Sequence, residues 1–414
     1  MTMHADRLLQ REHSPAVAAS ALDRWLLRTM MSALPGAGYE VVLWDGSRAG
    51  DTTGMQVHIR DQAALWHVVR NPALHFGDLY ASGRIEVEGD LVTFLERTYA
   101  ALDAGRTSSG SAWWKVWTDA APRSRSIEAA RDNIGQHYDL GNDFYELWLD
   151  QASMQYTCAY FPQPGMTLEA AQRAKMDHVC RKLRLRPGQS VFEAGCGWGG
   201  FALHMAREYG VQVRAWNISR EQVRFATERA RREGLGGRVA FIEDDYRNIG
   251  AASGKCDAFV SVGMLEHVGP ENYGALGALI ARCLAPRGLG LIHSIGRNHP
   301  EAMNGWIEQR IFPGAQPPSL GEMMAIFEPS GLSVLDVENL RLHYAETLRH
   351  WMARYLAAFD QVQASRGGEF ARAWHLYLAG SVAAFTTGCM QLFQVLFAHA
   401  GNNDLPVSRR HLYP

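Results

Sequence analysis

The chain has 414 residues, of which 47% are hydrophobic and 20% are charged, and its formal net charge is −2 at pH 7. This composition is that of an ordinary globular protein, and the length favours two domains over a single core. The near-neutral charge argues against a nucleic-acid binder, which usually carries a basic excess.

The first hundred residues predict a small α+β domain at 1–102. The expected elements are strands at 39–44 and 54–59, a helix at 61–70, glycine turns with a brief strand at 76–90, and an apolar helix at 91–102. Residues 103–126 then turn to Gly, Ser, Thr, Arg and Pro, broken by an aromatic cluster around Trp113 and Trp117. This change of composition is typical of a flexible linker with one anchored amphipathic patch.

Strands alternate with helices over residues 127–414, which is the pattern of a doubly wound α/β sheet. The expected strands are 190–193, 211–217, 239–243, 258–262 and 290–294, and the expected helices are 200–209, 221–233, 346–360 and 370–399. We therefore predict a Rossmann-like doubly wound sheet, preceded by the small α+β domain and followed by added C-terminal helices.

The segment with the clearest chemistry follows the first of these strands. Residues 191–200 read Val-Phe-Glu-Ala-Gly-Cys-Gly-Trp-Gly-Gly, an apolar strand that runs through Glu193 into a glycine turn. Gly195 and Gly197 let a ligand lie against the main chain, at the strand ends where open α/β sheets bind ligands. The spacing lacks the third glycine of a dinucleotide fingerprint and resembles motif I of class I S-adenosylmethionine (SAM) methyltransferases. SAM is therefore the expected cofactor.

The second strand departs from the usual nucleotide-binding pattern. An acidic residue at its carboxyl end normally holds the ribose hydroxyls, but this chain has Asn217 there. The amides of Asn217 and Gln222 would have to serve instead.

The cysteines and the first residues of the chain indicate a reducing, cytoplasmic location. The six cysteines include no C-x-x-C pair, so zinc ribbons and thioredoxin-type sites are not expected. Residues 1–15 carry charges without an apolar core, unlike a signal peptide. Residues 378–400 are apolar but interrupted by Ser, Thr and Gln, which favours a buried or lipid-lining helix over a membrane span. No metal is expected, because the histidines show no ligand spacing such as H-E-x-x-H.

Several segments together resemble the cyclopropane-fatty-acid synthase family, which includes the mycolic acid cyclopropane synthases. They are 136–150, 154–161, 193–199, 245–247, 266–269 and 347–349. The resemblance implies transfer of a methylene unit from SAM to the cis double bond of an unsaturated acyl chain in a membrane phospholipid. Methyl transfer leaves a carbocation, a bound bicarbonate or carbonate ion removes a proton from the new methyl group, and the cyclopropane ring closes.

The resemblance also implies which residues hold that ion. The set is Cys158, Glu266, His293, Ile295 and Tyr344. An oxyanion in an apolar pocket needs several hydrogen bonds, here from the His293 imidazole, the Tyr344 hydroxyl and backbone amides near Cys158 and Ile295. Glu266 would repel an anion, so we expect it to share a proton with the ion or to orient His293.

The same resemblance places SAM along the strand ends. The cofactor-binding set is Tyr156, Thr157, Glu193, Gly195, Gly197, Asn217, Gln222, Asp245 and Tyr246. Tyr156 and Thr157 are expected at the methionine end, Asn217 and Gln222 at the ribose, and Asp245 with Tyr246 at the adenine. At position 217 the family more often has threonine, which departs from the sequence here.

Two groups of residues have more than one interpretation. Aromatic side chains are either plain core or the walls of a dry site that stabilise a passing cation; the candidates are Tyr156, Tyr160, Phe161, Trp306, Tyr344, Phe385 and Phe393. The basic stretch from Arg173 to Arg186 is either a solvated helix face or a surface for anionic lipid headgroups. Cys196 is expected to be a buried small hydrophobe.

The leading hypothesis is a SAM-dependent cyclopropane-fatty-acyl-phospholipid synthase that works peripherally at the cytoplasmic membrane face. One alternative keeps the substrate but gives a methylene- or methyl-branched chain. Others are a non-catalytic protein that binds lipid and SAM, and a methyltransferase of a small soluble molecule. In long members of the family similar N-terminal domains are associated with lipid engagement and dimer contacts, so a homodimer is also considered.

Overall fold

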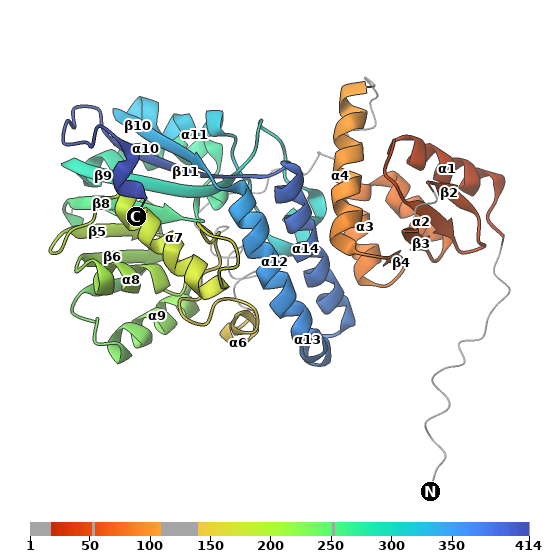
Figure 1. The fold of residues 1–414 in the computed structure, drawn as a ribbon, viewed down its shortest axis with the longest axis horizontal. Helices are drawn as coiled ribbons and strands as arrows, with labels where there is room; N and C mark the ends of the chain where they lie inside the picture. The colour runs from red at the N-terminus through yellow and green to blue at the C-terminus, as the bar shows by residue number, and fades with distance from the viewer. Residues whose placement is uncertain (1–17, 52–53, 109–139, 251–252, 414) are drawn as a thin grey trace, which may run out of the picture. The chain divides into compact units, whose positions relative to one another are not determined.

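The computed structural model describes residues 18–51, 54–108, 140–250 and 253–413 (Figure 1). The chain divides into two compact units, Met1–Ala112 and Trp113–Pro414, and the division falls within the predicted linker. Residues 109–126 of that linker, with the tryptophan cluster, lie outside the described residues, as do the first residues of the chain and positions 136–139 of the first family-like segment.

The first unit is an α+β domain, as predicted. Its described elements are α1 (Ala21–Ser32), β1 (Glu40–Leu43), β2 (Arg48–Gly50), β3 (Gln56–Ile59), α2 (Gln62–Arg70), α3 (Pro72–Ala81), β4 (Ile85–Glu88) and α4 (Leu91–Ser108). The sheet order is β2-β1-β3-β4, with β1 and β3 parallel and the other pairs antiparallel. Buried apolar side chains such as Leu27, Ile59 and Leu65 form its core.

Two predictions for this unit need correction. Residues 76–81, predicted as turn, belong to α3, which starts from the side-chain cap of Asn71 with Pro72 in its first turn. This asparagine–proline start is a helix signal that the glycines further on obscured. Helix α4 continues to Ser108, six residues beyond the predicted end at Leu102, so the linker does not begin at Asp103.

The second unit is built on a seven-stranded sheet in the order β10-β11-β9-β8-β5-β6-β7. Its strands are β5 (Ser190–Ala194), β6 (Gln212–Asn217), β7 (Val239–Glu243), β8 (Cys256–Val262), β9 (Leu284–Gly296), β10 (Leu332–Asn339) and β11 (Gln391–His399). The five strands from β9 to β7 are parallel, whereas β11 pairs antiparallel with both β9 and β10. This is the α/β architecture predicted for residues 127–414.

Helices cover both faces of this sheet (Figure 1). They are α6 (Asn142–Glu146), α7 (Leu168–Lys182), α8 (Gly200–Glu208), α9 (Arg220–Arg232), α10 (Tyr273–Cys283), α11 (Leu320–Phe327), α12 (Arg341–Ala357), α13 (Phe359–Arg366) and α14 (Gly368–Thr387). One core packs α7 and α8 against side chains such as Val191 and Leu291. The other packs α10 and α11 against Phe259 and Ile292. Successive strand residues therefore face different helical layers.

The predicted helix over 370–399 is wrong in its second half. Helix α14 ends at Thr387, where Gly388 adopts a left-handed conformation with φ of +88°, and residues 391–399 form strand β11. Because β11 is buried on both faces, its apolar run has no alternation, and such a run cannot be told from a buried helix by periodicity. Strand β10 was not predicted at all.

Within the described ranges, we find no helix whose length and apolarity would let it cross a membrane.

Candidate active site

Many of the predicted site residues lie at or just after the carboxyl ends of β5, β6, β7, β8 and β9, and the others lie on the segment before α7, on α9 and on α12. His293 and Ile295 are two residues apart in β9, so both side chains share the face that Leu291 turns toward α7. In the antiparallel neighbour β11, Gln394 stands opposite His293 and Leu392 opposite Ile295. This pairing brings a strand late in the chain against two of the predicted catalytic residues.

The turn after β5 can be built only from glycine at its key positions. Gly195, Gly197 and Gly199 have φ values of +82°, +51° and +79°. A Cβ at Gly195 would lie 2.9 Å from the Cβ of Met264, and one at Gly200 would lie 2.0 Å from the carbonyl oxygen of Ser153. The turn is held by the Gly195 amide, which donates to the Trp216 carbonyl at 2.9 Å.

A cavity opens beside this turn, at the ends of β5 and β6. Its walls are Gly195, Trp216, Asn217, Ile218, Asp244, Asp245, Tyr246, Arg247, Met264, His267 and Val268. Gly195, Asn217, Asp245 and Tyr246 belong to the predicted cofactor set. The other five members do not line this cavity, although Gly197 and Gln222 are joined to Asn217 by hydrogen bonds.

Asn217 and Gln222 form a pair at the position predicted for the ribose. The Asn217 amide donates to the Gln222 Oε1 at 2.8 Å and to the Gly197 carbonyl at 3.2 Å. The Gln222 Nε2 is buried and has no hydrogen-bond partner among the described residues. A buried donor without a partner is costly unless a ligand accepts its hydrogen bond, which fits a hydroxyl group at this place.

Asp245 is more engaged than the sequence indicated. Both of its carboxylate oxygens accept from the Arg247 guanidinium at 2.8 Å, and Oδ1 also accepts from the Arg247 backbone amide. The guanidinium also lies 5.7 Å from the centre of the Tyr246 ring. Asp245 thus lines the cavity with a carboxylate that Arg247 already neutralises, while the Tyr246 ring offers a flat aromatic wall.

Glu193 and Lys175 lie buried beneath the methionine end of the predicted SAM site. The Lys175 ammonium donates to Gln155 Oε1 at 2.6 Å and to Thr157 Oγ1 at 2.9 Å. Burial raises the pKa of Glu193 to about 8 and lowers the pKa of Lys175 to about 8. Lys175 therefore fixes the segment that carries Tyr156 and Thr157.

Two lysines of the basic stretch, Lys175 and Lys182, are buried, so at these positions the stretch forms neither a solvated helix face nor a lipid-binding surface. Lys175 and Lys182, seven residues apart on α7, are each 1% exposed and point into the unit. Their ammonium groups are satisfied by hydrogen bonds, which is how a buried lysine avoids its desolvation cost. Arg173 and Arg186 at the edges of the stretch are exposed.

Tyr156 belongs to an aromatic cluster formed with Trp148, Trp351 and Tyr377. Its hydroxyl lies 2.8 Å from the hydroxyl of Tyr377 on α14, and its ring lies 5.2 Å from Trp148 and 5.3 Å from Trp351. Trp148 and Trp351 are fully buried. This cluster excludes water from the space between α6, α12 and α14.

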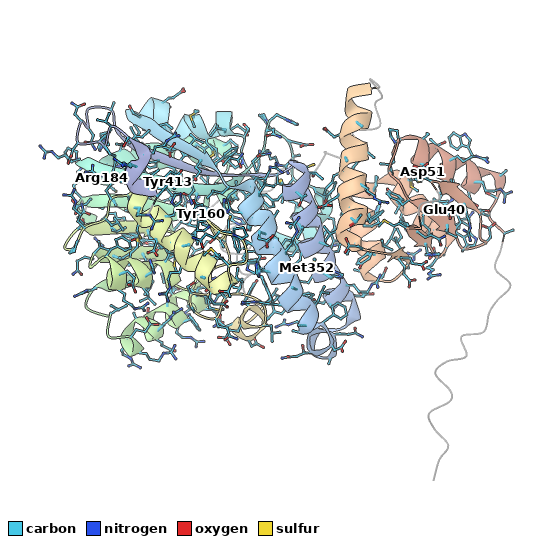
Figure 2. The ribbon with its side chains drawn as sticks, viewed as in Figure 1. Glu40, Asp51, Tyr160, Arg184, Met352 and Tyr413 are labelled. Carbon is cyan, nitrogen blue, oxygen red and sulfur yellow. The ribbon has the colours of Figure 1, made fainter. Side chains whose placement is uncertain are left out.

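Two other aromatic candidates lie away from the site. Phe393 packs into the core on the opposite face of the sheet, with Phe259 and Ile292. Tyr160 stacks on the His178 ring with a centroid distance of 4.5 Å, and Tyr413 lies on the same imidazole at 6.0 Å (Figure 2). Both are packing residues, as the alternative interpretation had it.

Glu266 contacts the backbone of Ile295 and not the ring of His293. It lies in a short 3₁₀ helix, Leu265–His267, and its Oε1 accepts from the Ile295 amide at 2.6 Å. Its Oε2 is buried without a hydrogen-bond partner among the described residues. Burial raises the pKa of Glu266 to about 7. The expectation that Glu266 orients His293 is therefore wrong, and the Ile295 amide is already in use.

Cys158 and Tyr344 meet at the carbonyl of Leu340. The Cys158 thiol lies 3.9 Å from this oxygen, and the Tyr344 amide donates to it at 3.1 Å. The Leu340 amide in turn donates to the carbonyl of Leu392, the residue opposite Ile295. Burial raises the pKa of the Cys158 thiol, so the group stays protonated. Among the five predicted ion-binding residues, Glu266 bonds Ile295 directly, while Cys158 and Tyr344 are connected to this strand pair through the backbones of Leu340 and Leu392.

His293 is buried, and one of its ring nitrogens, like Glu266 Oε2, has no hydrogen-bond partner among the described residues. Its Nδ1 lies 3.1 Å from the Nε2 of Gln394, and its Nε2 has no hydrogen-bond partner among the described residues. Burial, together with the charges of Lys175 and Lys182, holds the pKa of His293 well below its usual range. The imidazole is therefore neutral and carries one proton.

This fold and site define a class of protein. A mixed seven-stranded sheet with a glycine turn after β5 and a cavity at the strand ends is the architecture of SAM-dependent methyltransferases. The structure is similar to that of coclaurine N-methyltransferase bound to N-methylheliamine and SAH, with a TM-score of 0.63 over 78% of this chain and 98% of that one, at 19% identity. That likeness concerns the fold alone.

The sequence narrows the class to one family. Residues 125–395 match the family model described as mycolic acid cyclopropane synthetase, so the chain belongs to this family and SAM is its cofactor. Residues 26–108 match a second model, described as a domain of unknown function, DUF7884. The family assigned from the sequence motifs is thereby confirmed.

The names of similar proteins agree with this assignment. The chain is 40% identical to the cyclopropane-fatty-acyl-phospholipid synthase of Escherichia coli K12, over 66% of this chain and 69% of that protein. It is 34% identical to a probable fatty acid methyltransferase of Pseudomonas putida, over 90% and 95%. The crystal structure of mycolic acid cyclopropane synthase CmaA1 complexed with SAH and CTAB matches with a TM-score of 0.60 at 30% identity, over 64% of this chain and 97% of that one.

Several residues of the site were missed from the sequence. His267 lines the cavity, Lys175 donates to Thr157, and Gln394, itself held by Lys182, contacts His293. The adjacency of His267 to Glu266 was a usable signal. Gln394 gave none, because its strand was predicted as a helix.

Proposed function

We propose that the protein transfers a methylene unit from SAM to the cis double bond of an unsaturated acyl chain in a membrane phospholipid, giving a cyclopropane fatty acid. SAM supplies the methyl group from its sulfonium, and a bound bicarbonate or carbonate ion takes the proton that the new methyl group loses. The remaining products are S-adenosylhomocysteine and the proton.

The observation that carries this proposal is the pair of unpartnered polar atoms at the predicted ion site. Glu266 Oε2 and His293 Nε2 are both buried, and neither has a hydrogen-bond partner within the described part of the chain. Their elements are in direct contact, because the Gly263 amide donates to the His293 carbonyl and the Ile295 amide donates to Glu266. A small oxyanion would satisfy both atoms.

The residues around that pair are suited to holding an anion in a dry site. A neutral imidazole donates one hydrogen bond without adding charge. Glu266, with a pKa raised to about 7 by burial, can hold a proton and share it with the ion, which removes the repulsion between two anions. Tyr344 packs its ring 4.6 Å from Phe385, which places an aromatic ring beside the hydroxyl-bearing residue of the predicted set.

Lipid access is proposed to involve the first unit. Leu22 and Trp25 on α1 and Trp66 on α2 are 49%, 54% and 45% exposed, and the indole of Trp66 donates to Asp23 on α1. Exposed tryptophans beside exposed arginines such as Arg28 suit a membrane interface, where aromatic rings enter the headgroup region and cations meet anionic lipids. We propose peripheral attachment at the cytoplasmic membrane face, with a homodimer as the assembly to check by light scattering.

The test is incubation of the full chain with SAM and vesicles of an unsaturated phospholipid, with bicarbonate present and removed. We expect acyl chains heavier by one CH2 unit, with upfield cyclopropane signals in the proton NMR spectrum and dependence on bicarbonate. Unchanged lipid would refute the proposal. If the protein only binds lipid, the wild type and Glu266→Gln should bind the vesicles equally well, and neither should convert the lipid.

A branched product is the second candidate. The chain is 33% identical, over 92% of its length, to the tuberculostearic acid methyltransferase UfaA1 of Mycobacterium tuberculosis, a relative whose name gives a different product. Loss of a proton from a neighbouring carbon would give this outcome in place of ring closure. Acyl chains heavier by one CH2 unit that show vinyl proton signals and no ring signals would identify it. Activity without any lipid surface would instead indicate a small soluble substrate.

A further inference from the structure

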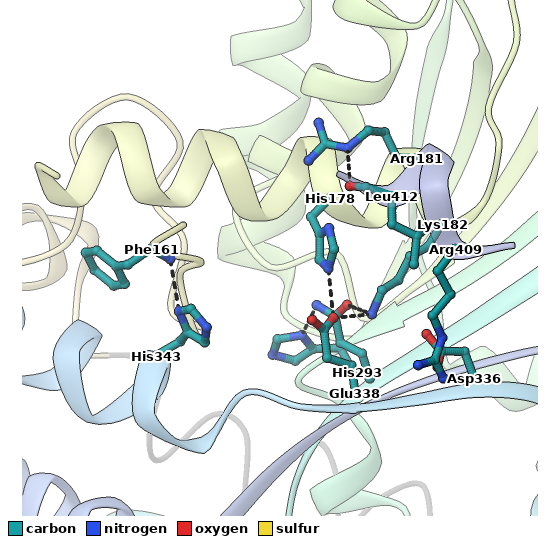
Figure 3. A network of polar contacts seen from close by, with 11 residues as sticks. Phe161, His178, Arg181, Lys182, His293, Asp336, Glu338, His343, Arg409 and Leu412 are labelled. Atoms are coloured by element: carbon teal, nitrogen blue, oxygen red, sulfur yellow. Dashed lines mark hydrogen bonds and ion pairs between the residues drawn. The ribbon is translucent and has the colours of Figure 1, made fainter. Parts of the chain in front are cut away.

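A chain of polar contacts runs from α7 through β10 and β11 to His293 (Figure 3). The Lys182 ammonium donates to Glu338 Oε2 at 2.6 Å and to Gln394 Oε1 at 2.7 Å. Glu338 Oε2 also contacts His178 Nε2 at 2.7 Å. The Nε2 of Gln394 then contacts His293 Nδ1 at 3.1 Å.

The lysine fixes which way the amide of Gln394 faces. An ammonium group only donates hydrogen bonds, so the atom of the Gln394 amide nearest Lys182 must be the oxygen. The amide nitrogen therefore faces His293, and an amide nitrogen also only donates. Reversing the amide would set two donors against each other at Lys182, in a place where Gln394 is 1% exposed.

The amide in turn fixes the proton of His293. Since the Gln394 NH2 donates to Nδ1, this nitrogen must accept and carries no proton. A neutral imidazole with a bare Nδ1 has its proton on Nε2. This Nε2 is buried and has no hydrogen-bond partner in the described ranges, and the same is true of Glu266 Oε2.

We propose that Lys182, acting through Gln394, is a positioning residue that locks His293 in the Nε2-protonated tautomer, so that an N–H donor faces the reaction site. This inference rests on the proposed function in one respect, because the donor is needed only if an oxyanion binds there. The tautomer itself follows from the contacts alone.

The lysine is held as a cation in this position by its other contacts. Lys182 is 1% exposed, and burial lowers its pKa, but the carboxylate of Glu338 opposes that effect. The hydrogen bond and charges of His178 and Lys182 lower the pKa of Glu338 to about 2 despite its partial burial, so this carboxylate stays ionised. The ion pair keeps the donor end of the chain in one protonation state.

The direct experiment is 15N NMR of the full-length protein labelled at its histidines, with His293 assigned from the signals lost in His293→Gln. A protonated ring nitrogen resonates far upfield of a bare one, so the spectrum of the resting protein reads the tautomer without any substrate. We expect a protonated Nε2 and a bare Nδ1. A protonated Nδ1 would overturn the proposal, whatever the activity of the enzyme.

Gln394→Glu is the matched switch, because it replaces the donating NH2 by an accepting oxygen of the same size. The proton of His293 is expected to appear on Nδ1, and turnover is expected to fall by about 10²-fold or more, the loss typical of removing one donor to a reacting oxyanion. SAM affinity should stay at the wild-type value. Unchanged turnover with a switched tautomer would overturn the role in the reaction.

Lys182→Met tests the lysine with a side chain of similar length. Freed from Lys182, the Gln394 amide can reverse, so we expect a mixture of His293 tautomers and reduced turnover, with Lys182→Arg restoring the single tautomer. Lys255→Met is the control, because Lys255 donates only to backbone carbonyls at Arg282 and Leu284, away from the site. A single Nε2-protonated tautomer in Lys182→Met would overturn the role of the lysine. Lack of cyclopropane product in wild type, with the tautomer as expected, would refute the proposed function and leave this inference standing.

Discussion

Replacing Gly195 and Gly197 by alanine, one at a time, separates the cost of backbone strain from the cost of steric overlap with Met264. Both residues have positive φ, so either substitution strains the backbone by roughly 1–2 kcal/mol. The methyl group of Gly195→Ala meets Met264, at 2.9 Å from its Cβ and 3.2 Å from its Cγ. At Gly197 no atom of the described residues other than its chain neighbours lies within 4 Å of the added methyl group. Overpacking of this kind costs a further ~1–3 kcal/mol.

We therefore expect Gly195→Ala to lose about 2–5 kcal/mol of unfolding free energy and Gly197→Ala about 1–2 kcal/mol. Thermal unfolding of the cofactor-free protein should show drops of about 4–10 °C and 2–4 °C, taking roughly 2 °C for each kcal/mol in a large domain. Differential scanning calorimetry measures both.

The SAM affinity of Gly197→Ala tests whether the cofactor lies in the open space beside Gly197. If the cofactor lies against this glycine, Gly197→Ala should weaken SAM binding by about tenfold, equivalent to ~1.4 kcal/mol, with little further loss of stability. Isothermal titration calorimetry gives the affinity. Equal destabilisation by the two variants would refute the role of Met264, and unchanged SAM affinity in both would refute the placement of the cofactor at this turn.

Three further predictions concern charge and membrane contact. Burial raises the pKa of Glu266 to about 7, so bicarbonate affinity should fall as the pH rises from about 6 to 8, because the proton that Glu266 shares is lost. The affinity of Glu266→Gln, measured in the same bicarbonate buffers, should depend less on pH. Identical curves for the two proteins would contradict the assignment. The pKa of Glu338 is lowered to about 2 from the ordinary 4.5, so the ionised carboxylate adds stability above pH 4.5 that disappears as the pH falls toward 2. Glu338→Gln should therefore lower the free energy of unfolding in urea by roughly 2 kcal/mol at pH 7 and by clearly less at pH 3. Trp25→Ser combined with Trp66→Ser should weaken sedimentation with anionic vesicles about thirtyfold, at ~1 kcal/mol for each half-exposed ring, while turnover on detergent-dispersed lipid stays unchanged.

Most elements of the fold could be predicted from local sequence patterns. The parallel strands β5 to β8 follow apolar runs that alternate with helices, and the first unit was recognised from short strands and turn residues. Strand β11 could not be recognised, because a segment buried on both faces reads as a helix when only its own residues are considered. Helix α3 was lost because the glycines after it outweighed the cap at Asn71.

The site divides in the same way. Gly195 and Glu266 belong to motifs that are contiguous in the sequence, and His293 was assigned from the family resemblance that those motifs established. Lys182 and Gln394 are 212 residues apart and meet only because β11 lies between β9 and β10. Such a contact leaves no local pattern, and the charge of Lys182 indicated a surface residue because buried lysines are rare.

The place of β11 in the sheet also sets the order in which the protein can be assembled on the ribosome. The glycine turn and the parallel strands β5 to β9 are synthesised first, but β9 then remains an edge strand, open to wrong pairing, until β11 arrives about a hundred residues later. Gln394 comes with β11. A nascent chain can thus present the cofactor turn well before His293 receives its neighbour, so the capacity for chemistry emerges with the last strand added to the sheet.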